Sequence, residues 1–101
     1  MTSRDPERQE REQLTALILD SSRPIVERLA AIEVLVDQAP ETAKLVMLSV
    51  GERVSEPREV LEAAGVGLAR VEHSGVMISE FDLRDMSEVA FIAWDKWRPA
   101  K

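Results

Sequence analysis

The side chains that most often carry enzyme chemistry are scarce in this chain, which has one histidine and no cysteine. The histidine, His73, is expected at the C-terminal end of a helix, where its ring can approach free carbonyl groups. No second histidine or thiol is available to complete a catalytic triad or a zinc site with it. Glu59 and Glu62 are spaced to share one helix face, where two carboxylates could bind a cation or transfer protons, although we favour a solvated surface.

Two glycines, Gly65 and Gly67, lie within a predicted helix rather than after a strand, so they do not form the phosphate-binding loop of a dinucleotide site. Their position indicates close helix packing or a kink, at some cost in helix propensity. The chain also lacks the Glu-x-x-His sequence that places metal ligands on a helix. We therefore predict no catalytic residue, no metal, no cofactor and no enzymatic activity.

The formal charge of −6, from 19 acidic and 13 basic residues, is the main clue to partners. A negative surface repels nucleic acid and anionic membranes and favours a partner protein with a basic surface, although ordinary solubility explains the charge as well. No apolar stretch has the roughly 20 residues needed to span a bilayer. Because the chain has no cysteine, it suits a reducing compartment, and we expect a cytoplasmic protein.

The elements that would position these residues are indicated by three apolar series with a spacing of four residues, each of which marks one stripe of a helix. The three series are Val26–Ala30–Val34, Val60–Ala64–Leu68 and Val89–Ala93–Trp97. Helix-start signals come before them. They are Pro24 as a first helical residue, Ser55 as the cap of the second helix, and Asp85 or Ser87 as the cap of the third.

Another apolar segment comes before each of these helices. Glu10–Leu19 and Glu41–Arg53 have helical spacing, and Pro40 suits the first turn of the second segment. Val76–Phe81 is shorter, and its valine and isoleucine would equally suit a brief extended segment. The chain therefore predicts three pairs of helices whose second members begin roughly 30 residues apart, the period of a helical solenoid.

The runs RPIVERLAAIEVL, PREVLEAAGVGL and MSEVAFIAW resemble the second helix of HEAT-type repeats, especially of the short bacterial kind. The resemblance implies an all-α fold of three HEAT-like helical hairpins stacked as a short right-handed solenoid; an antiparallel helical bundle is the alternative. Residues 7–98 would form this single domain, after a flexible N-terminus at residues 1–6. The chain departs from the family where an arginine usually follows the valine, because Glu27, Leu61 and Ala90 stand there.

In HEAT-like solenoids the second helices line a concave face that commonly receives the partner, and here they would contribute nine acidic and four basic residues. These are Glu27, Glu33, Asp37, Glu56, Glu59, Glu62, Glu72, Glu88 and Asp95, with Arg28, Arg58, Arg70 and Lys96. Ala31, Gly65 and Trp94 share one aligned position, which indicates either a shallow groove closed by Trp94 or a core sealed by Trp94 and Trp97. The residues predicted to bind the partner are Glu59, Glu62, Glu88, Phe91, Trp94 and Asp95.

Three functions remain in consideration. The first is a protein-binding module without catalysis, and specifically an immunity protein that neutralises a cognate toxin, because small size, acidity and lack of catalytic groups are typical of that class. The second is a scaffold or self-associating adaptor that dimerises through its aromatic C-terminal helix. The third is a HEAT-like lyase or cofactor-handling protein, which the wider family includes but for which the chain offers no set of catalytic residues.

Overall fold

The computed structural model of the chain describes residues 6–99, and all the regular secondary structure in that range is helical. The helices are α1 (Pro6–Leu19), α2 (Ile25–Gln38), α3 (Pro40–Gly51), α4 (Arg58–His73) and α5 (Glu88–Trp97). The predicted all-α class is therefore confirmed. The flexible N-terminus predicted for residues 1–6 lies outside the described residues except for Pro6, which is the first residue of α1.

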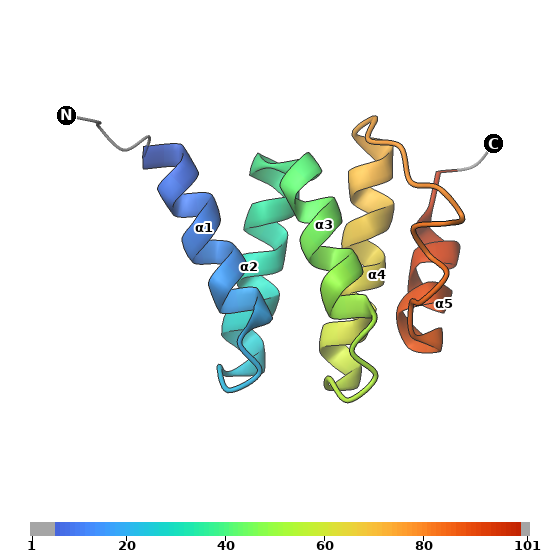
Figure 1. Cartoon of the computed structure of the whole chain (residues 1–101), viewed down its shortest axis with the longest axis horizontal. Helices are drawn as coiled ribbons and strands as arrows, with labels where there is room; N and C mark the ends of the chain where they lie inside the picture. Colours follow the sequence, from blue (N-terminus) through green and yellow to red (C-terminus); the bar gives the residue numbers. More distant parts are fainter. Residues whose placement is uncertain (1–5, 100–101) are drawn as a thin grey trace.

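The helices form two layers (Figure 1). The antiparallel pairs α1–α2 and α3–α4 stand side by side, with α1 and α3 in one layer and α2 and α4 in the other, and α5 packs against α4 at the end of the row. Helices α4 and α5 run in the same direction, because Gly65 lies against Ala90 while His73, at the end of α4, lies against Trp97. The result is an elongated stack in which α2, α4 and α5 make up the second layer.

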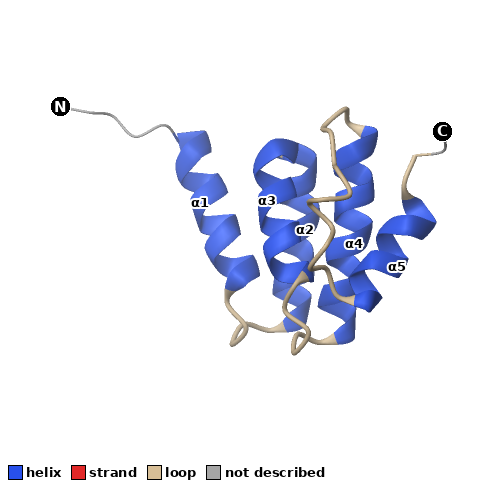
Figure 2. Cartoon of the chain, turned by 45° about the vertical axis from the view of Figure 1, so that its right-hand side comes forward, coloured by secondary structure: helices blue, strands red, loops and turns tan. Residues whose placement is uncertain are grey.

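A loop takes the place of the first helix that the sequence predicts for the third pair (Figure 2). Val76–Phe81 is neither a helix nor a strand, because residues 76–79 are irregular and residues 80–81 lie in turns. Side-chain contacts hold this segment on α3. Lys44 donates from Nζ to the carbonyl oxygen of Met77 at 2.8 Å and forms an ion pair with Asp82 at 3.1 Å. The loop begins at Gly75, whose φ of 108° is a conformation that side chains disfavour, so α4 ends there.

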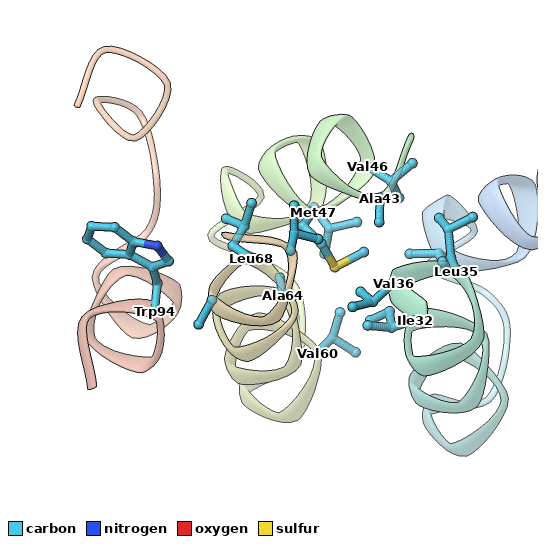
Figure 3. Close-up of a cluster of buried hydrophobic side chains, with 14 of the residues drawn as sticks. Ile32, Leu35, Val36, Ala43, Val46, Met47, Val60, Ala64, Leu68 and Trp94 are labelled. Atoms are coloured by element: carbon cyan, nitrogen blue, oxygen red, sulfur yellow. The ribbon is translucent and has the colours of Figure 1, made fainter. Parts of the chain in front are cut away.

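The core lies between the two layers, where apolar side chains of α2, α3 and α4 meet (Figure 3). The series predicted on α4 is confirmed, because Val60, Ala64 and Leu68 are all fully buried. Around them pack the other residues labelled in the central part of Figure 3, which are Ile32, Leu35, Val36, Ala43, Val46 and Met47.

The series predicted on α2 and α5 are wrong. On α2, Val26, Ala30 and Val34 are exposed, and the buried face is shifted round the helix to Ile32 and Leu35 and their neighbours. The reason is that apolar residues occupy most of the circumference of α2, so their spacing alone does not select one face.

On α5, the buried residues are Ala90 and Trp94, each one position after a residue of the predicted series. Val89 and Ala93 are partly buried and Trp97 is exposed. Of the predicted caps, Ser87 is confirmed, because its hydroxyl accepts a hydrogen bond from the Ala90 amide at 3.3 Å. Ser55 is not the cap of α4, because Pro57 is the residue immediately before that helix.

A buried ion pair joins the two turns that close the helical hairpins. The Arg28 side chain, on α2, is 1% exposed and donates from Nη1 and Nη2 to the two carboxylate oxygens of Glu56 at 2.8 and 2.7 Å. The same guanidinium donates to the carbonyl oxygen of Ile18 at 3.0 and 2.7 Å, near the end of α1. Glu56 also accepts from Arg53 and Ser21. Each side-chain nitrogen and oxygen atom of this pair therefore has at least one hydrogen-bond partner, as burial of two charges requires.

This pair predicts a loss of stability in acid. Hydrogen bonds from the Arg28 guanidinium hold the pKa of Glu56 below its usual range, although burial opposes the shift. A carboxyl group whose pKa is lower in the folded than in the unfolded chain stabilises the fold fully above its unfolded pKa of about 4.3 and loses that contribution as the pH falls further. We expect the free energy of unfolding, measured with urea, to fall between pH 5 and pH 3.

Glu56→Gln is the variant that checks the assignment, because it cannot titrate. It should be less stable than the parent at pH 7 but should lose less stability between pH 5 and pH 3. Asp20 and Asp82, whose pKa values are also lowered by hydrogen bonds from Ser22 and Ser79, keep their share of the acid dependence in both proteins. Identical acid dependence in the parent and the variant would contradict the role given to Glu56.

Candidate partner-binding site

The contact between α4 and α5 is unusually close and is built on Gly65. A Cβ atom at this position would overlap the carbonyl oxygen of Ala90 and would lie 2.8 Å from the Cβ of Ala93. The backbone of α5 therefore rests directly on the backbone of α4, which confirms the packing role predicted for this glycine. Gly67 serves the other side of α4, where a Cβ would lie 3.2 Å from Val36 and 3.1 Å from Met47.

On the outer side of this contact, α4 and α5 enclose a groove of about 420 Å³. Its apolar lining comes from one residue of α4 and four of α5, and charged side chains of both signs complete it. The apolar residues are Val66, Val89, Ile92, Ala93 and Trp97, and the charged ones are Arg58, Glu62, Glu88 and Lys96. We call these nine residues the α4–α5 groove. A concave apolar surface with a few charged groups is typical of sites that accept a ligand or a partner side chain.

Two of the six residues predicted to bind the partner lie together in this groove, and the other four lie elsewhere on the surface or in the interior. Glu62 and Glu88 line it, whereas Glu59 is exposed on α4 and is not among the lining residues. Phe91 and Trp94 instead line a second hollow of about 520 Å³ between α5 and the loop, which also includes Glu88. Asp95 is exposed and lies 3.8 Å from Arg98. The six residues therefore do not form one surface.

Trp94 does not close the shallow groove predicted along the position that it shares with Ala31 and Gly65. Its side chain is 4% exposed, its Nε1 donates to Glu72 at 3.1 Å, and the Arg98 guanidinium lies 4.5 Å from its ring centre. It lies on the opposite side of α4 from the central cluster (Figure 3). The alternative, in which Trp94 seals the end of the core, is correct for this residue. It is wrong for Trp97, whose side chain is 56% exposed and lines the α4–α5 groove.

Sequence reasoning missed Val66 and Ile92 as possible site residues, and it named Lys96 only as one of the basic residues of the second helices. Val66 lies between the two glycines of α4. Because Gly65 is in close contact with α5, the side chain of the next residue lies at the edge of that contact and lines the groove. Ile92 and Lys96 follow Glu88 at intervals of four residues, so the three share one side of α5. This spacing could have identified them, but only once the buried side of α5 was known.

The acidic surface predicted for the second helices is present in reduced form. Glu56 is buried with Arg28, and Glu72 is partly buried against Trp94, so neither contributes to it. Seven acidic residues of the predicted set remain exposed with three basic ones. These are Glu27, Glu33, Asp37, Glu59, Glu62, Glu88 and Asp95, with Arg58, Arg70 and Lys96.

The groups considered for chemistry in the sequence are placed as follows. His73 is the last residue of α4, as predicted, and its Nε2 lies 3.3 Å from the carbonyl oxygen of Trp97. Glu59 and Glu62 are both exposed, and Glu62 forms an ion pair with Arg58 at 3.3 Å. Across residues 6–99, no three acidic or histidine side chains are grouped to hold a metal ion, and no helix is long and apolar enough to cross a membrane.

Comparison of the chain with models of protein families, with curated proteins and with solved structures gave no match. The resemblance to HEAT-type repeats therefore stays a prediction, and the site is described by its geometry alone.

Proposed function

We propose that this protein is a non-catalytic module that binds another protein, and that the α4–α5 groove receives apolar side chains of that partner. The observation that carries the proposal is Trp97, a large aromatic side chain left 56% exposed beside an apolar hollow. Exposed tryptophan is costly in water, and tryptophan is enriched among the residues that dominate binding energy at interfaces. The charged rim formed by Glu62, Glu88 and Lys96 would fix the orientation of the partner.

We propose more specifically that the partner is a toxin and that binding of this protein neutralises it. The excess of acidic side chains on the second layer suits a basic partner, and many nucleases carry basic surfaces for their substrate. A small acidic protein that covers such a surface would compete with the nucleic acid. The product of a gene adjacent to that of this protein is the first partner to test.

Trp97→Ala is the variant that tests the groove. If the proposal is right, calorimetric titration with the candidate partner gives a dissociation constant below the micromolar range, and the variant binds at least about 10-fold more weakly. Trp97 lies at the surface, so the variant should fold normally. Val54→Ala provides the matched control, because Val54 is 78% exposed in the turn between α3 and α4 and does not line the groove. Equal affinities of the two variants, or no binding at micromolar concentrations, would exclude this site.

Self-association is a second candidate, favoured by the exposure of Phe91 and Ile92 on α5. Two copies could pack these faces together, with Glu88 of one helix near Lys96 of the other in an antiparallel arrangement. Light scattering separates the possibilities: a dimer that becomes a monomer on Ile92→Glu substitution supports self-association. A protein that is monomeric at all concentrations excludes it.

A further inference from the structure

The outer side of α2 carries an apolar stripe that the fold does not use. Val26, Ala30 and Val34 are spaced by four residues and therefore lie in line along the helix. All three are exposed, and Val26 has 77% of its surface in contact with solvent. The buried residues of α2 lie on the opposite side of the helix, toward α1, α3 and α4, so this stripe faces away from the core. Figure 1 shows how these helices surround one side of α2.

The stripe has no evident role in stability. Valine is a weaker helix former than most polar residues, so Val26 and Val34 lower the helix propensity of α2. Val26, which is 77% exposed, adds little buried surface in return, whereas Val34 is 37% exposed. Exposed apolar residues that are scattered singly need no explanation, but three in line along one helix form a continuous strip about 12 Å long. The corresponding side of α4 is largely charged, with Arg58, Glu59, Glu62 and Arg70 exposed.

Acidic side chains that form no ion pair within residues 6–99 accompany the stripe, two of them on α2 and one on α4. Glu33 and Asp37 on α2, and Glu59 on the neighbouring α4, form no ion pair within the described part of the chain. Glu27 and Glu62, in contrast, are paired with Arg23 and Arg58 at i, i+4 spacing. The stripe is therefore accompanied by carboxylates whose charge is not compensated locally.

We propose that this α2 stripe, consisting of Val26, Ala30 and Val34, binds an amphipathic helix of the partner that has basic residues beside its apolar face. An apolar stripe of this spacing accepts the apolar stripe of a second helix, which is a recurrent mode of peptide recognition. Lysine or arginine side chains on either side of that stripe would meet the free carboxylates of Glu33, Asp37 and Glu59. The inference rests on the proposed partner-binding function and adds the chemistry of the partner and a second contact surface.

A model peptide tests the chemistry without knowledge of the natural partner. The probe is a helical peptide of leucine and lysine with leucine at every third or fourth position, and a peptide of the same pattern with glutamate in place of lysine is its control. At physiological salt, we expect the lysine peptide to shift the amide resonances of α2 and of the outer side of α4, and the glutamate peptide to shift none. Shifts confined to other helices, or no shifts at all, would overturn the proposal.

Two pairs of variants establish the location. Glu33→Lys with Asp37→Lys should weaken binding of the lysine peptide at least about 10-fold, because it reverses the charge beside the stripe. Glu41→Lys with Glu52→Lys makes the same change of net charge at exposed positions, one in the first turn of α3 and one directly after its end, and should leave the affinity within about 3-fold. Equal weakening by both pairs would show a response to net charge only, and would overturn the proposal.

The apolar contribution is measured with Val26→Ser and Val34→Ser together, which should also weaken binding at least about 10-fold while the free energy of unfolding stays within about 1 kcal/mol. The natural partner separates this inference from the proposed function. If the affinity for the natural partner depends on Trp97 but not on the two valines, the groove remains a binding site and the proposal for the α2 stripe is overturned. A dimer of the parent protein that the valine variant dissociates would identify a second copy as the occupant, and it would likewise overturn the proposal.

Discussion

Replacing Gly65 by alanine is expected to lower the free energy of unfolding by about 3 kcal/mol or more, although alanine is the better helix former. The added Cβ would overlap the carbonyl oxygen of Ala90 and would lie 2.9 Å from the backbone nitrogen of Trp94. Both are backbone atoms, which no side-chain rotation can move away. Helix α5 must therefore shift as a unit, which opens the side of the core that Trp94 seals.

Urea unfolding monitored by tryptophan fluorescence measures this effect. The parent holds Trp94 in a buried site, so a displaced α5 should also shift the native emission of the variant to longer wavelength. Gly51→Ala is the matched control, because a Cβ there would lie 3.4 Å from a flexible Met86 side chain, which is ordinary contact. The control should change stability by no more than about 1 kcal/mol. If Gly65→Ala is as stable as the parent, then α5 does not rest on α4 in the way described.

Replacing Arg28 by methionine is expected to cost about 3–5 kcal/mol, because it leaves the buried Glu56 carboxylate without its main partner. The loss has a second part: the carbonyl oxygen of Ile18, near the free end of α1, loses both of its guanidinium donors. Since the total stability of a domain of this size is about 5–15 kcal/mol, the single variant is expected to be close to unfolding.

A double-mutant cycle separates the two parts of this effect. Glu56→Met in the Arg28→Met background should recover part of the loss, because two apolar residues replace a broken ion pair, but the unsatisfied Ile18 carbonyl should keep the double variant below the parent. The exposed pair Arg58–Glu62, at i, i+4 spacing on α4, is the control. The same substitution there, Arg58→Met, should cost less than about 0.5 kcal/mol. Equal losses at the two arginines would contradict the role assigned to burial.

Much of the local structure could be read directly from the sequence. Regular spacing predicted the two helical hairpins and the buried series of α4, and residue type predicted a cap at Asp85 or Ser87, of which Ser87 is the one observed. Helix periodicity and capping are properties of short segments. Gly65 and Gly67 were correctly associated with helix packing for the same reason. The third pair was predicted less well, since residues 76–81 are equally compatible with a helix and an extended segment, and only their contacts with Lys44 and the rest of α3 fix them as a loop.

The candidate site was the least predictable part. Glu62 and Glu88, which were predicted to bind the partner, line the α4–α5 groove. Of the two tryptophans that the sequence offered as seals of the core, only Trp94 is buried, and Trp97 is exposed. The difference arises because two tryptophans three residues apart on one helix point to nearly the same side. Which of them is buried depends on where the backbone of α5 rests on Gly65, and that contact lies 29 residues from Trp94 along the chain.

The scarcity of side chains suited to nucleophilic or metal chemistry was determined by the sequence alone, because composition does not depend on the fold. The all-α class followed from periodicity within single helices. Only the tertiary structure decided which face of α2 is buried, because apolar residues surround most of that helix. The side chain of Arg28 can be buried only where the Glu56 carboxylate and the Ile18 carbonyl oxygen accept its hydrogen bonds. That contact between distant segments leaves Val26, Ala30 and Val34 on the surface, where the proposed partner binds.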